Sequence, residues 1–518
     1  MPRYENVVDP SIGRIYDAVN LTEEDADRLF RLVTVLHQKR GKNRLRRDFY
    51  HMHVNVQNIG IALSCEMLDK IRVACSWPAK AVDVLAQRSI LDGFVFESGA
   101  EDEHMQRILL DNRMAQKYPM AAVSEGICSG MMWTLSRGKV GRSNVRIKTH
   151  SFETSAGIWD GNEERLECGM AVISNRDFTP WDAQLGYAPD VINLYTPEAT
   201  VVLRRSADGK RWEAEYHRHN MGRPLMEPMC FAPSMDRPFG KSRISRAVMG
   251  ITMSKLREDC RSEISAEFFT TPQKFLLGAT DEAFDMDRYQ AYIGNIFIAS
   301  KDEDGDVPQF GQLTQGSMQP HVEYSRSLAA QFAGETAIPL HSLGVVSDNP
   351  DSAEAMQMAE RDLVQLAEQM NRGNGESLRN VALMAMALEK GPMGSIDDLD
   401  DDEYSVMVKW HNPSMPSIAA TADAWQKAAT VAPYIAQTEE FLEGLGIDRA
   451  TRRRMLNQKR VIDGRSFMEV SVGNDDTTGG DASLLRADEG GAGLGTRVRL
   501  GGVIGDGGAG PVGSLIEG

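Results

Sequence analysis

The sequence predicts an α+β fold that is rich in helices. Apolar residues recur at helical spacing in 21–40, short alternating segments lie among turn residues in 126–235, and one long helical pattern spans Lys241–Phe269. At 518 residues, the chain has room for about three domains of ~150 residues each. A single elongated subunit built from several parts fits the same length.

The composition is that of an ordinary soluble chain with a negative charge. Hydrophobic residues make up 42% of it and charged residues 25%, and the formal net charge is −17. Proteins that hold nucleic acid tightly usually carry a basic footprint, which this overall balance lacks. We therefore expect that any DNA the protein meets slides past it.

The cysteines indicate a reducing compartment. They are far apart, form no C-x-x-C pair and have no histidine at zinc-finger spacing, so we expect reduced, mostly buried thiols in a cytoplasmic protein. No signal-peptide pattern opens the chain and no run of about 18 apolar residues occurs, so no membrane segment is expected. The six cysteines are Cys65, Cys75, Cys128, Cys168, Cys230 and Cys260.

The N-terminal half is expected to mix helices with strands. Thr22 and the acidic residues after it predict the start of a helix over 21–40. A second helix is predicted near Trp77, with Gly93 as its stop. The Asp-Gly turn at Asp208, between two strand-like runs, predicts a β-hairpin.

From Lys241 the pattern becomes mainly helical. The first helix is expected to end before Pro272, and a second one to span Val322–Ala337. Asp351, with Glu354 three residues on, predicts the start of another long helix. Three further segments complete the chain: a strand at Ser405–Trp410, a helical block over 417–470, and a Gly-rich, disordered tail over 473–518.

Five segments follow one another in a fixed order along this pattern. They are VDVLAQRSILDGF at Val82–Phe94, LLDNRMAQKYPMAAVSEGICSG at Leu109–Gly130, RPFGKSRIS at Arg237–Ser245, AIPLHSLG at Ala337–Gly344 and ATADAWQKA at Ala420–Ala428. Their succession over residues 20–470 resembles the portal protein of tailed bacteriophages, of the siphophage type. No single segment is specific, and the resemblance depends on their order.

The resemblance implies an elongated, helix-rich portal subunit with named parts. These parts would be a wing (1–240), a first stem helix (241–270), a clip (271–315), a second stem helix (316–340), a tunnel loop (341–350), a spine helix with wing closure (351–416), a helical crown (417–472) and the disordered tail (473–518).

The resemblance also implies a function without catalytic groups or cofactors. Portal subunits form a ring, twelve-fold in that family, at one capsid vertex, and it conducts double-stranded DNA during packaging and ejection. The implied partners are other copies of the chain, DNA, the large terminase, the major capsid protein, the scaffold and the head-completion adaptor. We expect the protein in the virion, and in the host cytoplasm during assembly. Another capsid or head–tail connector protein and the packaging ATPase are the rival interpretations.

The ATPase interpretation depends on the triplet Gly240–Ser242. A phosphate loop needs a glycine five positions before Gly240, because its backbone wraps the phosphates, and Met235 stands there. We therefore interpret the triplet as a helix N-terminus with basic residues.

Metal binding is not favoured by any local set of side chains. Each histidine pair lies on one predicted strand face without the further ligands that such a site needs, and the acidic turn has its glycine out of place for a calcium loop. We expect these groups on polar surface. They are His51 with His53, His217 with His219, and the turn with Asp302, Asp304 and Asp306.

The first long helix carries its charges in two stripes. At about 100° per residue, the stripes lie roughly 140° apart, so a basic flank of one subunit would meet the acidic flank of the next in a ring. A solvated, charged helix explains the pattern equally well. The basic stripe is Arg257 and Arg261, and the acidic stripe is Asp259, Glu263 and Glu267.

The predicted tunnel loop is marked by what it lacks. From His341 to Glu360 there is no Lys or Arg, and each basic contact to DNA would add salt-dependent affinity. Such a lining would hold DNA weakly, whereas the alternative is a plain connector between helices. The candidate lining residues are Ser342, Leu343, Gly344, Val345, Val346, Ser347, Asp348 and Asn349.

A basic patch lies in the final helical block. It comprises Arg452, Arg453, Arg454, Lys459 and Arg460. A crown that faces packaged DNA could use it, and a solvated helix face is equally compatible with it.

Overall fold

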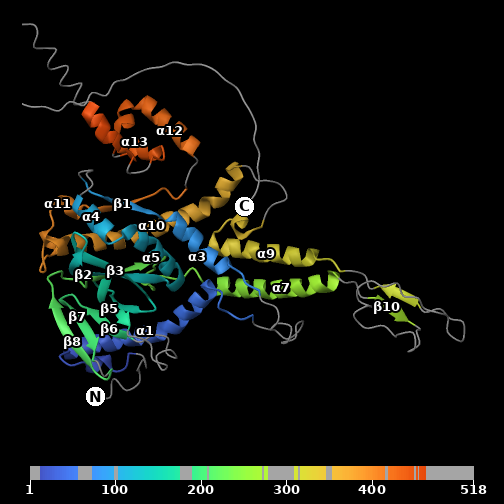
Figure 1. Ribbon diagram of the computed structural model, residues 1–518, viewed down its shortest axis with the longest axis horizontal. Helices are drawn as coiled ribbons and strands as arrows, with labels where there is room; N and C mark the ends of the chain where they lie inside the picture. The colour runs from blue at the N-terminus through green and yellow to red at the C-terminus, as the bar shows by residue number, and fades with distance from the viewer. Residues whose placement is uncertain are drawn as a thin grey trace, which may run out of the picture. The chain divides into compact units, whose positions relative to one another are not determined.

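The computed structural model describes residues 12–56, 73–97, 103–175, 189–206, 209–270, 274–277, 309–312, 316–345, 353–414, 418–447, 451–452 and 454–462 (Figure 1). The chain forms two compact units, one up to Met415 and one from Pro416. Among the helices in these residues, none combines the length and the apolar character that crossing a bilayer requires.

A five-stranded antiparallel sheet forms part of the first unit, with its strands adjacent in chain order. The strands are β4 (Ser155–Asp160), β5 (Arg165–Asn175), β6 (Pro189–Tyr195), β7 (Ala199–Arg205) and β8 (Trp212–Arg218). The pairing of β7 with β8 confirms the predicted hairpin.

Helix α1 (Glu23–Tyr50) packs on this sheet through one apolar stripe. The Thr22 hydroxyl accepts the backbone N–H of Asp25 at 3.2 Å, which confirms the predicted helix start. The helix runs ten residues beyond the expected end, to Tyr50, through Gly41 and a mainly basic segment that contains no proline. The stripe consists of Leu29, Leu32, Val33 and Leu36.

A second sheet, in the order β3-β2-β9, holds the largest apolar cluster of the described residues together with α5 and α10. Trp133 of β2 and Tyr118 of α5 are fully buried in it. The elements are α4 (Glu103–Asp111), α5 (Met114–Cys128), β2 (Gly130–Val140), β3 (Ser143–Ser151), β9 (Met226–Cys230) and α10 (Ala353–Lys390).

Two strands that are far apart in the sequence pair with each other in the first unit. Strand β1 (Leu91–Val95) pairs antiparallel with β12 (Met407–Trp410). Helix α3 (Trp77–Arg88) precedes β1, and Gly93 lies inside that strand at an irregularity of its register. The prediction that Gly93 stops the helix was wrong, because Gly93 serves the strand irregularity instead.

Two antiparallel helices, α7 (Arg246–Thr270) and α9 (Gln319–Thr336), lie side by side in the first unit (Figure 1). Between them in the sequence, β10 (Lys274–Leu277) pairs antiparallel with β11 (Gln309–Gln312). The helix expected from Lys241 begins only at Arg246, because the Ser245 hydroxyl accepts the N–H of Val248 and caps it there.

Short elements complete the first unit. They are η1 (Ile15–Asp17), η3 (Leu340–Leu343), η4 (Ile396–Asp398) and α11 (Asp401–Tyr404). In the exposed acidic segment around Asp400, the Asp400 side chain caps α11 by accepting the N–H of Glu403. The expected capping residue Asp351 lies outside the described residues, as do most of the predicted clip and the tail.

The second unit contains α12 (Ile418–Val431), η5 (Pro433–Gln437), α13 (Glu439–Gly444) and the helical residues 454–462. Trp425 meets Phe441 edge-on with ring centroids 6.0 Å apart. A side chain on Gly444 would place its Cβ 1.8 Å from Trp425 Nε1, so this close packing requires glycine.

The five cysteines within the described residues are free, as expected. Burial raises the pKa of Cys75 and Cys128 to about 11, and that of Cys168 to about 12. These thiols stay protonated at neutral pH and are poor nucleophiles.

Candidate functional site: the α7–α9 helix pair and its junction

The segment Arg237–Ser245 joins the sheets to α7 through a tight backbone turn. Gly240 has a φ of +67°, and a Cβ there would come within 2.4 Å of the Phe231 carbonyl oxygen. The next residue, Lys241, donates its N–H to that same carbonyl at 2.9 Å. Glycine is therefore required both for the conformation and for the close approach.

The two residues after Lys241 bind the ends of helices. The Ser242 hydroxyl reaches the carbonyl oxygens of Gly126 (3.2 Å) and Ile127 (2.6 Å), near the end of α5. Arg243 donates to the carbonyls of Ala81 in α3 and Thr336, the last residue of α9, both at 2.8 Å. A buried cation thus lies at the negative end of α9.

This geometry argues against a phosphate loop at Gly240–Ser242. The backbone N–H groups of Gly240, Lys241 and Arg243 donate to carbonyl oxygens of the protein, and that of Ile244 donates to the Ser242 hydroxyl. A phosphate loop must leave such groups free for its ligand. The triplet positions a helix junction instead.

The α7–α9 pair is held by a buried charge contact. Glu258 of α7 is only 5% exposed, and its carboxylate lies 2.5 Å from Nδ1 of His321 on α9. Because a carboxylate only accepts, the imidazole donates this hydrogen bond. Arg261 approaches the other Glu258 oxygen at 3.5 Å. The sequence interpretation missed this contact, since nothing local marks Glu258 and His321 as neighbours.

The charged residues of the two predicted stripes on α7 differ in whether they have a partner within the protein. Arg261 pairs with Glu258 as above, and Asp259 pairs with Lys255 one turn earlier on the same helix. Glu263 and Glu267 are exposed and have no ion pair within the described part of the chain. The remaining member, Arg257, donates to the Ser254 hydroxyl at 3.0 Å.

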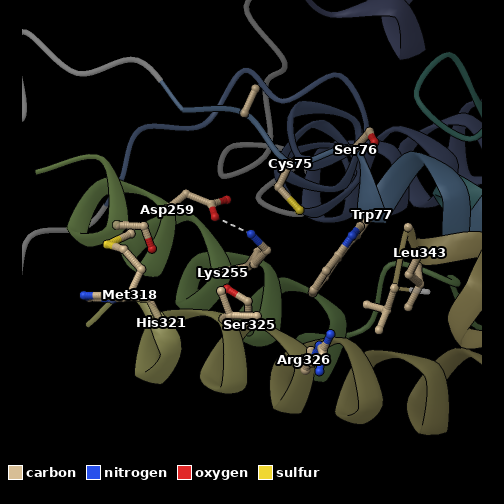
Figure 2. A pocket seen from close by; sticks show the side chains of 15 residues that line it. Cys75, Ser76, Trp77, Lys255, Asp259, Met318, His321, Ser325, Arg326 and Leu343 are labelled. Carbon is tan, nitrogen blue, oxygen red and sulfur yellow. Dashed lines mark hydrogen bonds and ion pairs between the residues drawn. The ribbon is translucent and has the colours of Figure 1, made fainter. Parts of the chain in front are cut away.

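A pocket of about 750 Å³ opens beside this pair of helices (Figure 2). The paired Lys255 and Asp259 lie on its wall, and the Lys255 ammonium is 5.7 Å from the ring centre of Trp77. Residues of the predicted loop, Leu343 to Val345, line the same pocket. The structure therefore brings one stripe residue and the start of the loop together.

The described part of the predicted tunnel loop is anchored to the body of the first unit. Leu343 is 7% exposed and packs in the cluster formed by α3, α7 and α9. The carbonyl of Ser342 accepts a hydrogen bond from the Lys80 ammonium. Leu343 is thus an anchor and no mobile lining residue, while Val346, Ser347, Asp348 and Asn349 lie outside the described residues.

The other candidate groups are placed as follows. His51 and His53 follow the end of α1 and do not lie in the expected strand. His217 is exposed on β8, whereas His219 follows that strand and is only 8% exposed, so the expectation of a polar surface was wrong for His219. Within the part of the chain that the structure describes, no three metal-ligating side chains gather. The acidic turn around Asp304 lies outside it.

The basic patch of the second unit is partly engaged within the protein. Arg452 is buried and lies 3.2 Å from Glu443 and 3.6 Å from Glu439. It holds the helices of that unit together, so it is not available to DNA. Lys459 donates to Gln437 at 3.1 Å.

Comparison with known proteins shows a similarity to one family. A family model described as phage portal protein, SPP1 Gp6-like, matches residues 262–441. The portal protein of Mycobacterium phage D29 is 23% identical over 501 residues, covering 93% of this chain and 95% of the relative. That of Mycobacterium phage L5 is 24% identical over 399 residues, covering 73% and 77%.

The sequence of this chain is similar to portal proteins of tailed phages. The range matched by the family model includes Glu263, Glu267 and His321 and excludes the junction Arg237–Ser245.

Solved structures of phage-like particles also resemble the chain. A chain from the virion of the native gene transfer agent particle gives a TM-score of 0.40 at 11% identity, covering 78% of this chain and 99% of that one. A chain from the neck of the native particle, computed with C12 symmetry, gives 0.39 at 12% identity, with coverage of 78% and 98%.

Proposed function

We propose that copies of this chain close into a ring at one capsid vertex, which conducts double-stranded DNA during packaging and ejection and connects head to tail. The observation that carries the proposal is the likeness to two mycobacteriophage portal proteins, which covers 93% of the chain for one and 73% for the other. A portal function needs geometry and no catalytic group, which agrees with a junction segment in which the N–H groups of Gly240, Lys241, Arg243 and Ile244 bind within the protein.

The α7–α9 pair would form the stem of each subunit. Its end near the sheets is fixed by Ser242 and Arg243, and its middle by the contact of Glu258 with His321. Glu263 and Glu267 remain exposed further along α7. In a head-to-tail ring, exposed acids on one flank can meet basic residues of the neighbouring subunit.

The division into wing, stem, clip, spine and crown follows the same assignment. The junction at Arg237–Ser245 would separate the wing from the stem, and α10 would be the spine. The large terminase, the major capsid protein, the scaffold and the head-completion adaptor would be the partners of such a ring.

The loop after Leu343 would line the channel. Its anchor is buried, and the segment up to Glu360 has no Lys or Arg. A lining without cations gives a polyanion little to bind.

A Val346→Lys ring tests this lining. We expect slower DNA packaging, because each added cation would bind phosphate in a salt-dependent way and the ring multiplies the effect. Packaging rates measured in a purified motor system, with Val346→Ala as the control, provide the comparison. Equal rates for the Lys and Ala rings would contradict a channel position for this loop.

End-on electron micrographs of the purified full-length chain, together with its native mass, test the ring itself. We expect annular particles with an axial channel. A compact monomer, or a chain that hydrolyses ATP, would contradict the proposal. A ring that blocks DNA passage would favour the other head–tail connector proteins.

A further inference from the structure

Four cations gather on one part of the first unit that the stem and the loop do not use. Arg113 directly precedes α5, and Lys117 follows one turn later on that helix. Arg146 and Lys148 are two residues apart on β3, so both side chains leave the same face of the strand. Strand β3 is an edge strand of its sheet.

A hydrogen bond fixes the helix and the strand in this arrangement. The Lys117 ammonium donates to the carbonyl of Ile147, which lies between Arg146 and Lys148. Arg113 and Arg146 are exposed, and the two lysines are half-buried. Three of the four residues lie on regular, packed elements, and Arg113 lies in the turn that begins α5. Their backbone positions are therefore fixed before any partner arrives.

The four charges repel one another. Burial lowers the pKa of Lys117, and the positive charges of Lys148, Arg113 and Arg146 lower it further. Burial and the positive charge of Arg146 likewise lower the pKa of Lys148. None of the four forms a salt bridge with any described residue. Clustered like charges destabilise a folded chain unless an anion joins them.

Some other surface cations of this acid-rich chain are paired with acids. Arg31 pairs with Glu167 at 3.0 Å, and Arg47 with Glu153 at 2.7 Å. The chain has 74 acidic residues against 57 Lys and Arg, so acidic partners are abundant. A group of four cations without any such partner in the described residues needs an explanation beyond solubility.

We propose that the cationic cluster of Arg113, Lys117, Arg146 and Lys148 binds the backbone phosphates of double-stranded DNA. The inference rests on the portal function proposed above, because that function brings the protein into contact with duplex DNA. In that assignment the cluster belongs to the wing, and the binding is separate from the passage of DNA through the channel.

The composition of the cluster favours a phosphate backbone over an acidic protein. Duplex DNA presents one charge per ~1.7 Å, and neutralising its phosphates releases counterions. Protein interfaces are depleted in Lys and are built around apolar or aromatic centres, which these four residues do not supply. Contacts to phosphates carry no sequence information, so binding of the backbone by these residues would be independent of sequence.

The test uses rings of the full-length chain and a covalently closed DNA minicircle, which cannot thread a channel. The triple variant R113Q/R146Q/K148Q removes three charges and keeps Lys117, whose hydrogen bond to Ile147 is structural. We expect roughly tenfold weaker minicircle binding, and a dependence of log affinity on log salt that is shallower by about 0.9 per lost phosphate contact.

The control variant K39Q/K42Q/R44Q removes the same charge from exposed positions on α1. It should bind the minicircle like the wild type. Equal weakening in both variants, or none in the cluster variant, would overturn the proposal. Stronger competition by poly-glutamate than by DNA would overturn it in favour of an acidic protein partner.

Two further measurements separate this inference from the portal function. Thermal unfolding of the cluster variant should occur at the same or a higher temperature than in the wild type, because repulsion is removed; a clear drop would indicate a structural role instead. Electron micrographs report ring formation independently. Rings without cluster-dependent DNA binding would refute only the cluster, whereas absent rings would refute the portal function.

Discussion

At the scale of single residues, Arg243 is the most heavily constrained side chain of the junction. It is buried, donates to carbonyls from two helices and lies 5.6 Å from the ring centre of Phe231. Burial lowers its pKa to about 10, and the group still carries its charge at neutral pH. The charge is accommodated by carbonyl dipoles and not by a carboxylate.

Replacing Arg243 by Met should destabilise the protein strongly. The Ala81 and Thr336 carbonyls would lose donors, and hydrogen bonds to charged groups contribute about 1.5–3 kcal/mol each, so we expect a loss of about 3 kcal/mol. Urea unfolding measures it. Arg246→Met, at an exposed position on α7, is the matched control, and equal losses in both variants would contradict this role.

A second buried group, Glu125 of α5, belongs to a polar network with α10. One of its oxygens accepts from Asn374 at 2.9 Å, and Asn374 also donates to Tyr118 at 3.3 Å. The other Glu125 oxygen and the Asn374 oxygen have no donor. Burial raises the pKa of Glu125 from 4.5 to about 8. A proton on Glu125 would supply a missing donor to this network.

The stability of the protein should therefore fall as pH rises from about 4.5 to about 8. In this range the unfolded chain has lost the Glu125 proton and the native protein retains it, so unfolding releases a proton. The free energy of unfolding drops by up to about 1.4 kcal/mol per pH unit. Glu125→Gln has no carboxyl group to ionise at this position. Its free energy of unfolding should therefore rise relative to that of the wild type as the pH increases.

Urea unfolding across that range checks this prediction. Glu376→Gln, at an exposed position on α10, serves as the control and should follow the wild type. Parallel curves for the wild type and Glu125→Gln would show that the carboxyl group is ionised in the native protein.

At the scale of elements, α7 and α9 depend on the contact of Glu258 with His321. Without His321, the buried Glu258 carboxylate would keep only its 3.5 Å contact with Arg261, and removing one partner of a buried pair costs about 3–5 kcal/mol. His321→Leu should accordingly destabilise the protein by about 3 kcal/mol. The double variant Glu258→Met with His321→Leu should recover most of this loss, because no buried charge is left unpaired and Arg261, which loses Glu258, is 39% exposed to water.

Thermal unfolding of the wild type, the two single variants and the double variant tests the coupling. Additive losses in the double variant would mean that the two side chains do not interact. If these variants still form rings in electron micrographs, the Glu258–His321 pair stabilises the subunit and not the contact between subunits.

The types of most described elements could be predicted because their signals are local. Thr22 marked a helix start, the Asp-Gly turn marked the β7–β8 hairpin, and Pro339 follows the end of α9. The predicted element boundaries were wrong where residues distant in the sequence determine them. The start of α7 moved because residues before Ser245 bind carbonyls of α3, α5 and α9 instead of turning into helix.

At the scale of the whole molecule, assembly should depend on the exposed acids of α7. Asp259 is excluded from this role because Lys255 neutralises it within the helix. Glu263 and Glu267 keep their charge available. The double variant Glu263→Lys and Glu267→Lys should prevent ring closure, because a basic flank of the neighbour would meet like charge.

Native mass spectrometry and electron microscopy give the oligomeric state of this variant. Glu164→Lys with Glu376→Lys, both exposed and away from α7, changes the net charge equally and should leave rings intact. Unchanged rings in the α7 variant would place the subunit contact on another surface.

The sequence by itself determined the types of the elements, because caps, turns and periodicity act over a few neighbouring positions. It also showed the segment without cations between His341 and Glu360 and the family likeness. Only the tertiary structure decided which charges are available. Glu258 meets His321 across 63 positions, and Lys117 meets the strand of Arg146 and Lys148 across about 30. Electrostatic pairing acts through space, so a linear pattern of charges could suggest stripes on a helix but could not tell the neutralised members from the free ones.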